Sequence, residues 1–140
     1  MAGSSMTFTY DRGYDGGGVL GRYSRVIADW VSDDATGAVT GTSRKIVGHL
    51  VKAVTDPGSP APSANYDIAL TDDASADILA NTDATLANRH TTTSETVEFF
   101  VKNAAAAAMN RGPVVCSTVT IAITNAGNSK AGQIILYVER

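Results

Sequence analysis

The sequence predicts an all-β protein: a single-domain β-sandwich or jelly-roll-like barrel of about eight strands, with one short Ala-rich helix and a flexible N-terminal arm. Several short segments alternate apolar and polar side chains, which is the period of a strand with one buried face. Turns rich in Gly, Pro, Asn and Asp separate these segments. With 140 residues, the chain has the length of one domain that buries a core without disulfides or metals.

Residues 1–21 have the most flexible composition, and the folded domain is expected over 22–140. A short extended run, Met6 to Tyr10, is followed by a crowd of glycines: Gly13, Gly16, Gly17, Gly18 and Gly21. Glycine loses the most backbone entropy on ordering, so this arm should be mobile by itself. Two interpretations stay open. Either the arm is a disordered tail, or Phe8, Tyr10 and Tyr14 anchor it on a neighbouring subunit.

Three strands are predicted in the first half of the domain, at residues 23–31, 38–43 and 45–55. In the first of them Val26, Ala28 and Trp30 share one face, and Trp30 is interpreted as a core anchor. A stiff loop over 56–62 follows, because its three prolines lack the backbone donors that a central strand requires.

The next segments are a strand over 65–71, a very short strand over 76–79 and a strand over 96–102. Between them lies a polar, nearly aperiodic loop over 80–94, long enough to suggest an interface, with Leu86 and Arg89 as candidate contact residues. The alanine run 104–108, with Asn103 before it and Gly112-Pro113 after it, predicts the short helix.

The last quarter, residues 117–139, is predicted to form a β-hairpin. Val119, Ile121 and Ile123 alternate with polar or small residues, and Ile134, Leu136 and Val138 repeat the pattern. The connection over 125–132 carries Asn and Gly, which tolerate the positive φ of hairpin loops. Cys116, the only cysteine, precedes this region and is expected to be a buried structural thiol.

The formal net charge of −3 argues against binding of nucleic acid, which depends on a basic footprint. The basic residues that come nearest to a cluster are Arg22, Arg25, Arg44 and Lys45. Aspartates at 29, 33 and 34 lie close by in sequence, so a solvated face of mixed charge is the favoured interpretation.

Catalytic signatures are sparse. The two histidines, His49 and His90, have no partner that the sequence identifies, and no nucleophile motif surrounds any serine. Asp72, Asp73 and Asp77 could suggest calcium, but their spacing is not that of a calcium-binding loop, so turn aspartates are favoured. We therefore expect no enzyme, no catalytic residue, no cofactor and no metal. Without a signal peptide or an apolar span, no membrane association is expected.

Five stretches carry a resemblance to a known class of proteins: Gly21 to Tyr23, Ala28 to Asp33, Tyr66 to Asp72, Asp77 to Leu79 and Val119 to Asn128. Together they are similar to small virion structural proteins of tailed bacteriophages and prophages. The resemblance covers residues 21–139 and rests on the amino-acid sequences of predicted strands and turns. The alanine run and the glycine-rich arm depart from it.

The resemblance implies a structural role in a virion, with no catalytic residues to transfer. The function expected from it is that of a capsid cement or decoration protein, made in the cytoplasm of the host bacterium and located on the capsid surface. Its expected partners are the major capsid protein and itself, as a trimer or dimer. A neck, tail or baseplate subunit is the alternative. A host-glycan-binding module is the second alternative, and it requires an exposed Trp30, Tyr14 or Tyr23.

Overall fold

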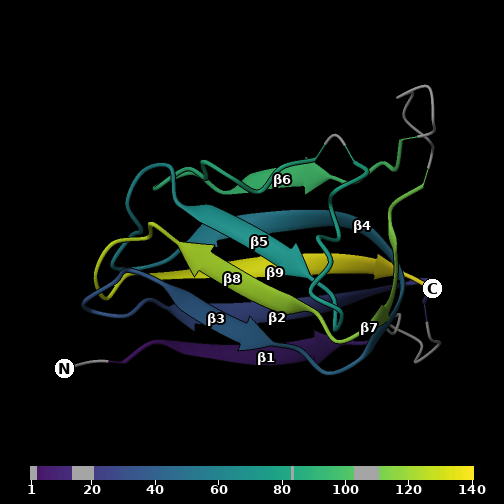
Figure 1. Cartoon of the computed structure of the whole chain (residues 1–140), viewed down its shortest axis with the longest axis horizontal. Coiled ribbons are helices and arrows are strands. Elements are labelled where there is room, and N and C mark those ends of the chain that lie inside the picture. The colour runs from purple at the N-terminus through teal and green to yellow at the C-terminus, as the bar shows by residue number, and fades with distance from the viewer. Residues whose placement is uncertain (1–2, 14–20, 83, 103–110) are drawn as a thin grey trace.

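The computed structural model describes residues 3–13, 21–82, 84–102 and 111–140, and they form nine strands in two antiparallel sheets (Figure 1). The larger sheet has the order β1 (Ser5–Asp11), β2 (Tyr23–Val31), β9 (Ala131–Glu139), β4 (Ile46–Pro57) and β6 (Glu95–Glu98), and β7 (Val114–Ser117) also pairs with β4. The smaller sheet has the order β3 (Val39–Thr42), β8 (Thr120–Thr124) and β5 (Asp67–Thr71). The described residues contain no helix, and none of them forms a helix that could span a membrane.

The core lies between the two sheets, because apolar side chains from both belong to one buried cluster. The alternation of β9 puts Ile134, Leu136 and Val138 into this cluster, and that of β8 puts Ile121 and Ile123 opposite them. The largest fully buried side chain is that of Trp30, which is 1% exposed, as the sequence predicts. Its ring centroid lies 5.6 Å from that of Tyr66, so these two rings fill the space between β2 and the start of β5.

Gly132 allows Trp30 to reach this position. The two residues are register partners in β2 and β9, and a Cβ added at Gly132 would lie 2.5 Å from Cζ2 of the indole. Because the indole is enclosed and cannot move aside, Gly132→Ala should lower the free energy of unfolding by about 1–3 kcal/mol, the usual cost of overpacking. Urea denaturation of both proteins measures this difference. Gly3→Ala is the control, since nothing lies within 4 Å of a Cβ there, and equal losses in both variants would contradict the explanation.

The predicted hairpin over 117–139 is wrong, although both of its strands exist. β8 pairs with β3 and β5 in the smaller sheet, whereas β9 pairs with β2 and β4 in the larger one. The connection between them therefore crosses from one sheet to the other. Alternation identifies the buried face of each strand, but two strands whose buried faces meet across a core give the same pattern as two paired strands.

Most other predicted strands agree with the structure to within a few residues. The segment 76–79 is not a strand, because Asp77 makes only an isolated bridge to Thr71 before a turn. The helix predicted over 103–110 lies outside the described residues. The described residues form nine strands rather than about eight, because 76–79 is not a strand while Ser5–Asp11 and Val114–Ser117 are strands of their own.

A flexible arm was predicted at the N-terminus, but its residues Ser5–Asp11 form a paired strand. Ser5–Asp11 pair with β2 without interruption, from Ser5 opposite Val31 to Asp11 opposite Arg25. The side chains of Met6, Phe8 and Tyr10 pack against the core cluster. This strand therefore belongs to the larger sheet, and the expected boundary of the folded domain at residue 22 moves to residue 5. Residues 14–20 lie outside the described part.

Cys116 is exposed, which corrects the expectation of a buried thiol. In β7 the side chains of Val115 and Ser117 point into the core, and alternation turns Val114 and Cys116 to the outer face. Cys116 lies opposite Val47 of β4, which is itself 60% exposed.

Candidate interface at the edge of the larger sheet

Five of the described strands have an edge that no other strand pairs with: β1, β6 and β7 in the larger sheet, and β3 and β5 in the smaller. A free edge presents unpaired backbone N–H and C=O groups, to which another chain can add a strand. Soluble proteins normally protect such edges with covering segments, short strands or charges. The five edges differ in how far they are protected.

The edge of β5 is covered by the chain that follows it. The backbone N–H of Ile68 donates to the carbonyl of Leu86 at 3.0 Å, and the N–H of Ile78 donates to the carbonyl of Leu70 at 3.0 Å. The edges of β3, β6 and β7 are short, since each strand has four residues, and β6 begins and ends with a glutamate. These four edges are therefore poor templates for a second chain.

The edge of β1 lacks such protection. The strand has seven residues, its first six are uncharged, it contains no proline, and its pairing with β2 has no bulge. Ser5, Thr7 and Thr9 are exposed on its outer face. Among the described residues, β1 is thus the longest uncovered and uncharged edge, and it is the candidate interface.

The end of β1 is fixed by polar contacts within the protein. Asp11, its only charged residue, accepts hydrogen bonds from Nη2 and Nε of Arg25 at 2.8 and 3.0 Å. The Asp11 carboxylate also accepts a hydrogen bond from the backbone N–H of Gly13 at 2.9 Å, and this bond and Arg25 together lower the pKa of Asp11. The strand is therefore held in place before any partner arrives.

The five candidate contact residues from the sequence end up in different surroundings. Phe8 and Tyr10 lie in β1 with their ring centroids 6.4 Å apart, half-buried against the protein's own core rather than free for a neighbour. Tyr14 lies outside the described residues. Leu86 and Arg89 are 2% and 8% exposed, so neither can serve as a surface contact.

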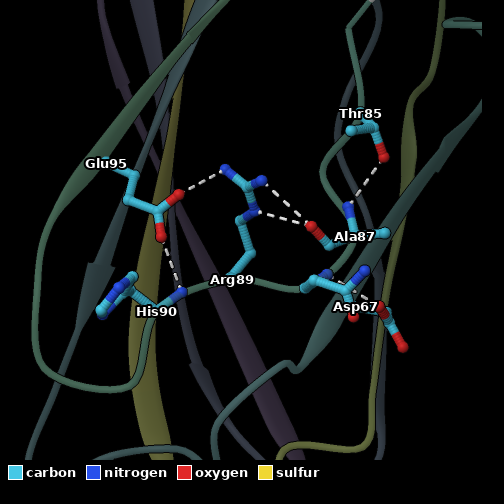
Figure 2. A network of polar contacts seen from close by, with 7 residues as sticks. Asp67, Thr85, Ala87, Arg89, His90 and Glu95 are labelled. Carbon is cyan, nitrogen blue, oxygen red and sulfur yellow. Dashed lines mark hydrogen bonds and ion pairs between the residues drawn. The ribbon is translucent and has the colours of Figure 1, made fainter.

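Arg89 is the centre of a polar network that holds the loop over 80–94 against the fold (Figure 2). Its Nη1 lies 2.9 Å from Oε2 of Glu95, and its Nε and Nη2 donate to the carbonyl of Ala87 at 3.2 and 3.0 Å. The other oxygen of Glu95 accepts the backbone N–H of His90 at 2.8 Å. Asp67 of β5 accepts the N–H of Asn88 at 2.9 Å. These polar groups of the loop are therefore bonded within the fold.

Breaking this network should destabilise the fold. Arg89→Met removes the charged hydrogen bonds to Glu95 and Ala87 and leaves both acceptors in a largely buried place, so we expect the free energy of unfolding to fall by about 1.5–3 kcal/mol. Chemical denaturation measures the change. The control is Arg111→Met, the same substitution at an exposed arginine. If Arg111→Met costs as much as Arg89→Met, the network is not what holds the loop.

His49 and Asp72, two of the other residues considered for catalysis or metal binding, make hydrogen bonds to the backbone. His49 Nδ1 lies 3.0 Å from the carbonyl oxygen of Gly112. Asp72 accepts the backbone N–H groups of Ala74 and Ala76, both at 2.9 Å, which is the bonding of a turn aspartate. In the described part of the chain, no three His, Cys, Asp or Glu side chains are grouped so that they could hold a metal ion.

Sequence reasoning identified Phe8 and Tyr10 but missed that their strand is an edge. The sequence does show the alternation of a strand here, since Met6, Phe8 and Tyr10 alternate with Ser5, Thr7 and Thr9. This alternation does not tell which strands lie beside β1 in the sheet. A comparison of the chain with models of protein families and with curated proteins finds no match.

Proposed function

We propose that the protein is a non-enzymatic structural protein of a tailed-phage virion, a capsid cement or decoration protein that self-associates and stabilises the lattice of the major capsid protein. The observation that carries the proposal is the open edge of β1, which offers a second copy an unprotected strand to pair with. The resemblance of residues 21–139 to small virion proteins supports the location.

The occupant of the β1 edge is a second copy of this chain. Two β1 strands that pair antiparallel around a two-fold axis near Phe8 extend the larger sheet across both subunits. Each subunit then supplies the same exposed, uncharged surface of Ser5, Thr7 and Thr9. On a capsid, many such dimers bound side by side add modest interface energies into a large resistance to internal pressure.

Charging this edge should dissociate the dimer. In the two-fold pairing Thr7 of one copy lies opposite Thr9 of the other, so Thr7→Lys together with Thr9→Lys sets like charges against each other. We expect the dimer dissociation constant to rise at least about tenfold, with the unfolding midpoint of the subunit nearly unchanged because both side chains are exposed. Analytical ultracentrifugation measures the constant.

The matched control for the charged edge is Thr40→Lys, an exposed threonine on the short edge strand β3. It should leave the dimer intact. A wild-type protein that stays monomeric at high concentration, or a dimer that tolerates both lysines in β1, would refute the assignment of the interface.

The location in the virion is tested by copy number. Purified, DNA-filled heads without tails should carry hundreds of copies per particle if the protein is a cement protein, and a quantitative gel of heads against tails measures this. A handful of copies that are lost with the tail would reject the cement role in favour of a neck, tail or baseplate subunit.

The glycan-binding alternative needs an exposed aromatic side chain, and the first residue named for it, Trp30, is buried. Stacking on a sugar ring needs an exposed aromatic face, and Trp30 is enclosed in the core at 1% exposure. Of the three aromatic residues named for this alternative, Tyr23 is 48% exposed and could still serve. No other observation favours this alternative.

A further inference from the structure

One end of the larger sheet holds a basic pocket of about 420 Å³. Its lining comes from the end of β1, the start of β2, the connection from β3 to β4 and the end of β9. Five cationic side chains line it: Arg12, Arg25, Arg44, Lys45 and Arg140. Among the described residues of the lining, Asp11 is the only acidic one, so the pocket concentrates positive charge in a chain whose net charge is negative.

Two of these cations are held in place by the fold. The guanidinium of Arg44 lies 3.7 Å above the centroid of the Tyr10 ring, a contact that favours this position of the cation. Arg140 donates from Nη1 to the carbonyl of Gly21 and from Nη2 to the carbonyl of Arg12, both at 2.9 Å. A side chain that is already ordered loses little entropy when it binds a ligand.

The positive charge is largely uncompensated. Asp11 pairs with Arg25 at 2.8 Å, which leaves four of the five lining cations without a carboxylate in the described lining. Arg44, Lys45 and Arg12 are exposed and therefore accessible to a ligand. This arrangement is that of an anion site, because guanidinium groups bind carboxylates and phosphates through paired hydrogen bonds.

The surroundings favour a short acidic peptide over a nucleic acid. Outside the pocket the chain has six Lys and Arg against thirteen Asp and Glu, so an extended polyanion would be repelled from the rest of the surface. The pocket also has apolar lining: Val26, Ile46 and Val138 are buried, and Val47 is 60% exposed. A peptide that carries a carboxylate next to an apolar side chain can use both features.

We propose that this basic pocket binds a short acidic segment of a partner protein, with a carboxylate on Arg44 and Lys45 and a neighbouring apolar side chain on Val47. That the partner is a capsid subunit rests on the proposed function, but the pocket and its ligand class do not. The pocket adjoins the β1 edge at Tyr10 and Asp11, whereas the residues assigned to the ligand, Arg44, Lys45 and Val47, lie outside β1.

The binding test uses the full chain and two blocked pentapeptides, Glu-Val-Glu-Val-Glu and Gln-Val-Gln-Val-Gln, in isothermal titration calorimetry at low salt. The glutamate peptide should bind saturably at one site and weaken as salt is added, while the glutamine peptide should not bind. The combined variant Arg44→Gln and Lys45→Gln should lose at least about tenfold in affinity. Its unfolding midpoint should stay that of the wild type, because both side chains are exposed.

Lys130→Gln is the matched control, since it removes one charge next to the start of β9, while the pocket lies at its other end. It should bind the glutamate peptide as the wild type does. Equal binding of the two peptides, undiminished affinity in the combined variant, or tighter binding of inorganic phosphate than of the glutamate peptide would each overturn the proposal.

Co-sedimentation with capsids distinguishes a failure of this inference from a failure of the proposed function. The wild-type protein should co-sediment with phage heads, and the combined variant should co-sediment at least about tenfold more weakly. A variant that attaches as well as the wild type would refute the role of the pocket while the cement function stands. A wild-type protein that fails to attach would refute the cement function, whereas peptide binding would still assign the pocket.

Discussion

Replacing Ile121 with aspartate should abolish cooperative folding of the protein. Ile121 is 0% exposed, and as the second residue of β8, the central strand of the smaller sheet, it has Gly41 of β3 and Leu70 of β5 as its register partners. A carboxylate there has no partner, and burying one costs several kcal/mol, which is comparable to the stability of about 5–15 kcal/mol of a typical domain. Circular dichroism of the variant should show no cooperative thermal transition.

The matched control is Thr40→Asp. Thr40 is exposed in β3, in the same small sheet, and pairs with Ala122 next to Ile121. The same carboxylate at this position stays in water, so the variant should keep a transition close to that of the wild type. A folded Ile121→Asp variant would mean that β8 does not form the inner face of the smaller sheet.

The strands of this protein were predictable because their alternation is a local property. The segment Tyr23–Val31 was placed to the residue, and Trp30 was correctly assigned to the core. Strand pairing is not local, and it was wrong for β8 and β9, which bury their faces against each other from opposite sheets. An Asn- and Gly-rich connection suits a hairpin and a crossing between sheets equally well.

The sequence pattern also could not show which side chains of a loop are buried. The polar stretch around Arg89 looked like a surface contact, yet it covers the edge of β5 and buries Leu86. A run of Asn, Thr and Asp is polar whether it binds a partner, water or the protein itself. Here backbone N–H groups of the loop donate to Asp67 and Glu95 of the flanking strands, and Thr82 and Thr85 accept backbone N–H groups within the loop. The exposed position of Cys116 was missed for a related reason. Its strand has only four residues, too few for the sequence to show which side chains face the core.

The basic pocket shows what only the fold can assemble. Sequence proximity suggested Arg22, Arg25, Arg44 and Lys45 as a cluster, and the fold keeps three of them around the pocket. It adds Arg12 and Arg140, which come from the two ends of the described chain. The aspartates that were expected to balance this cluster, at 29, 33 and 34, do not line the pocket.

Deleting residues 1–11 should strongly destabilise the protein, whereas removal of a free arm would not. The deletion takes away the whole of β1, its pairing with β2, and the half-buried side chains of Met6, Phe8 and Tyr10. Loss of this apolar contact alone should lower the free energy of unfolding by about 3 kcal/mol, taking roughly 1 kcal/mol for each half-buried side chain. Urea denaturation measures the loss, and a lower denaturant slope should accompany it because less surface is buried in the folded state.

Deleting residues 2–4 is the control for this experiment, because β1 begins at Ser5 and the exposed Gly3 and Ser4 lie before it. This shorter deletion should leave the free energy of unfolding unchanged. If the deletion of residues 1–11 were equally harmless, β1 would not contribute to the larger sheet, and the edge assigned to self-association would instead be that of β2. The charged variant at Thr7 and Thr9 keeps β1 in its sheet, so it tests self-association without the loss of stability that the deletion brings.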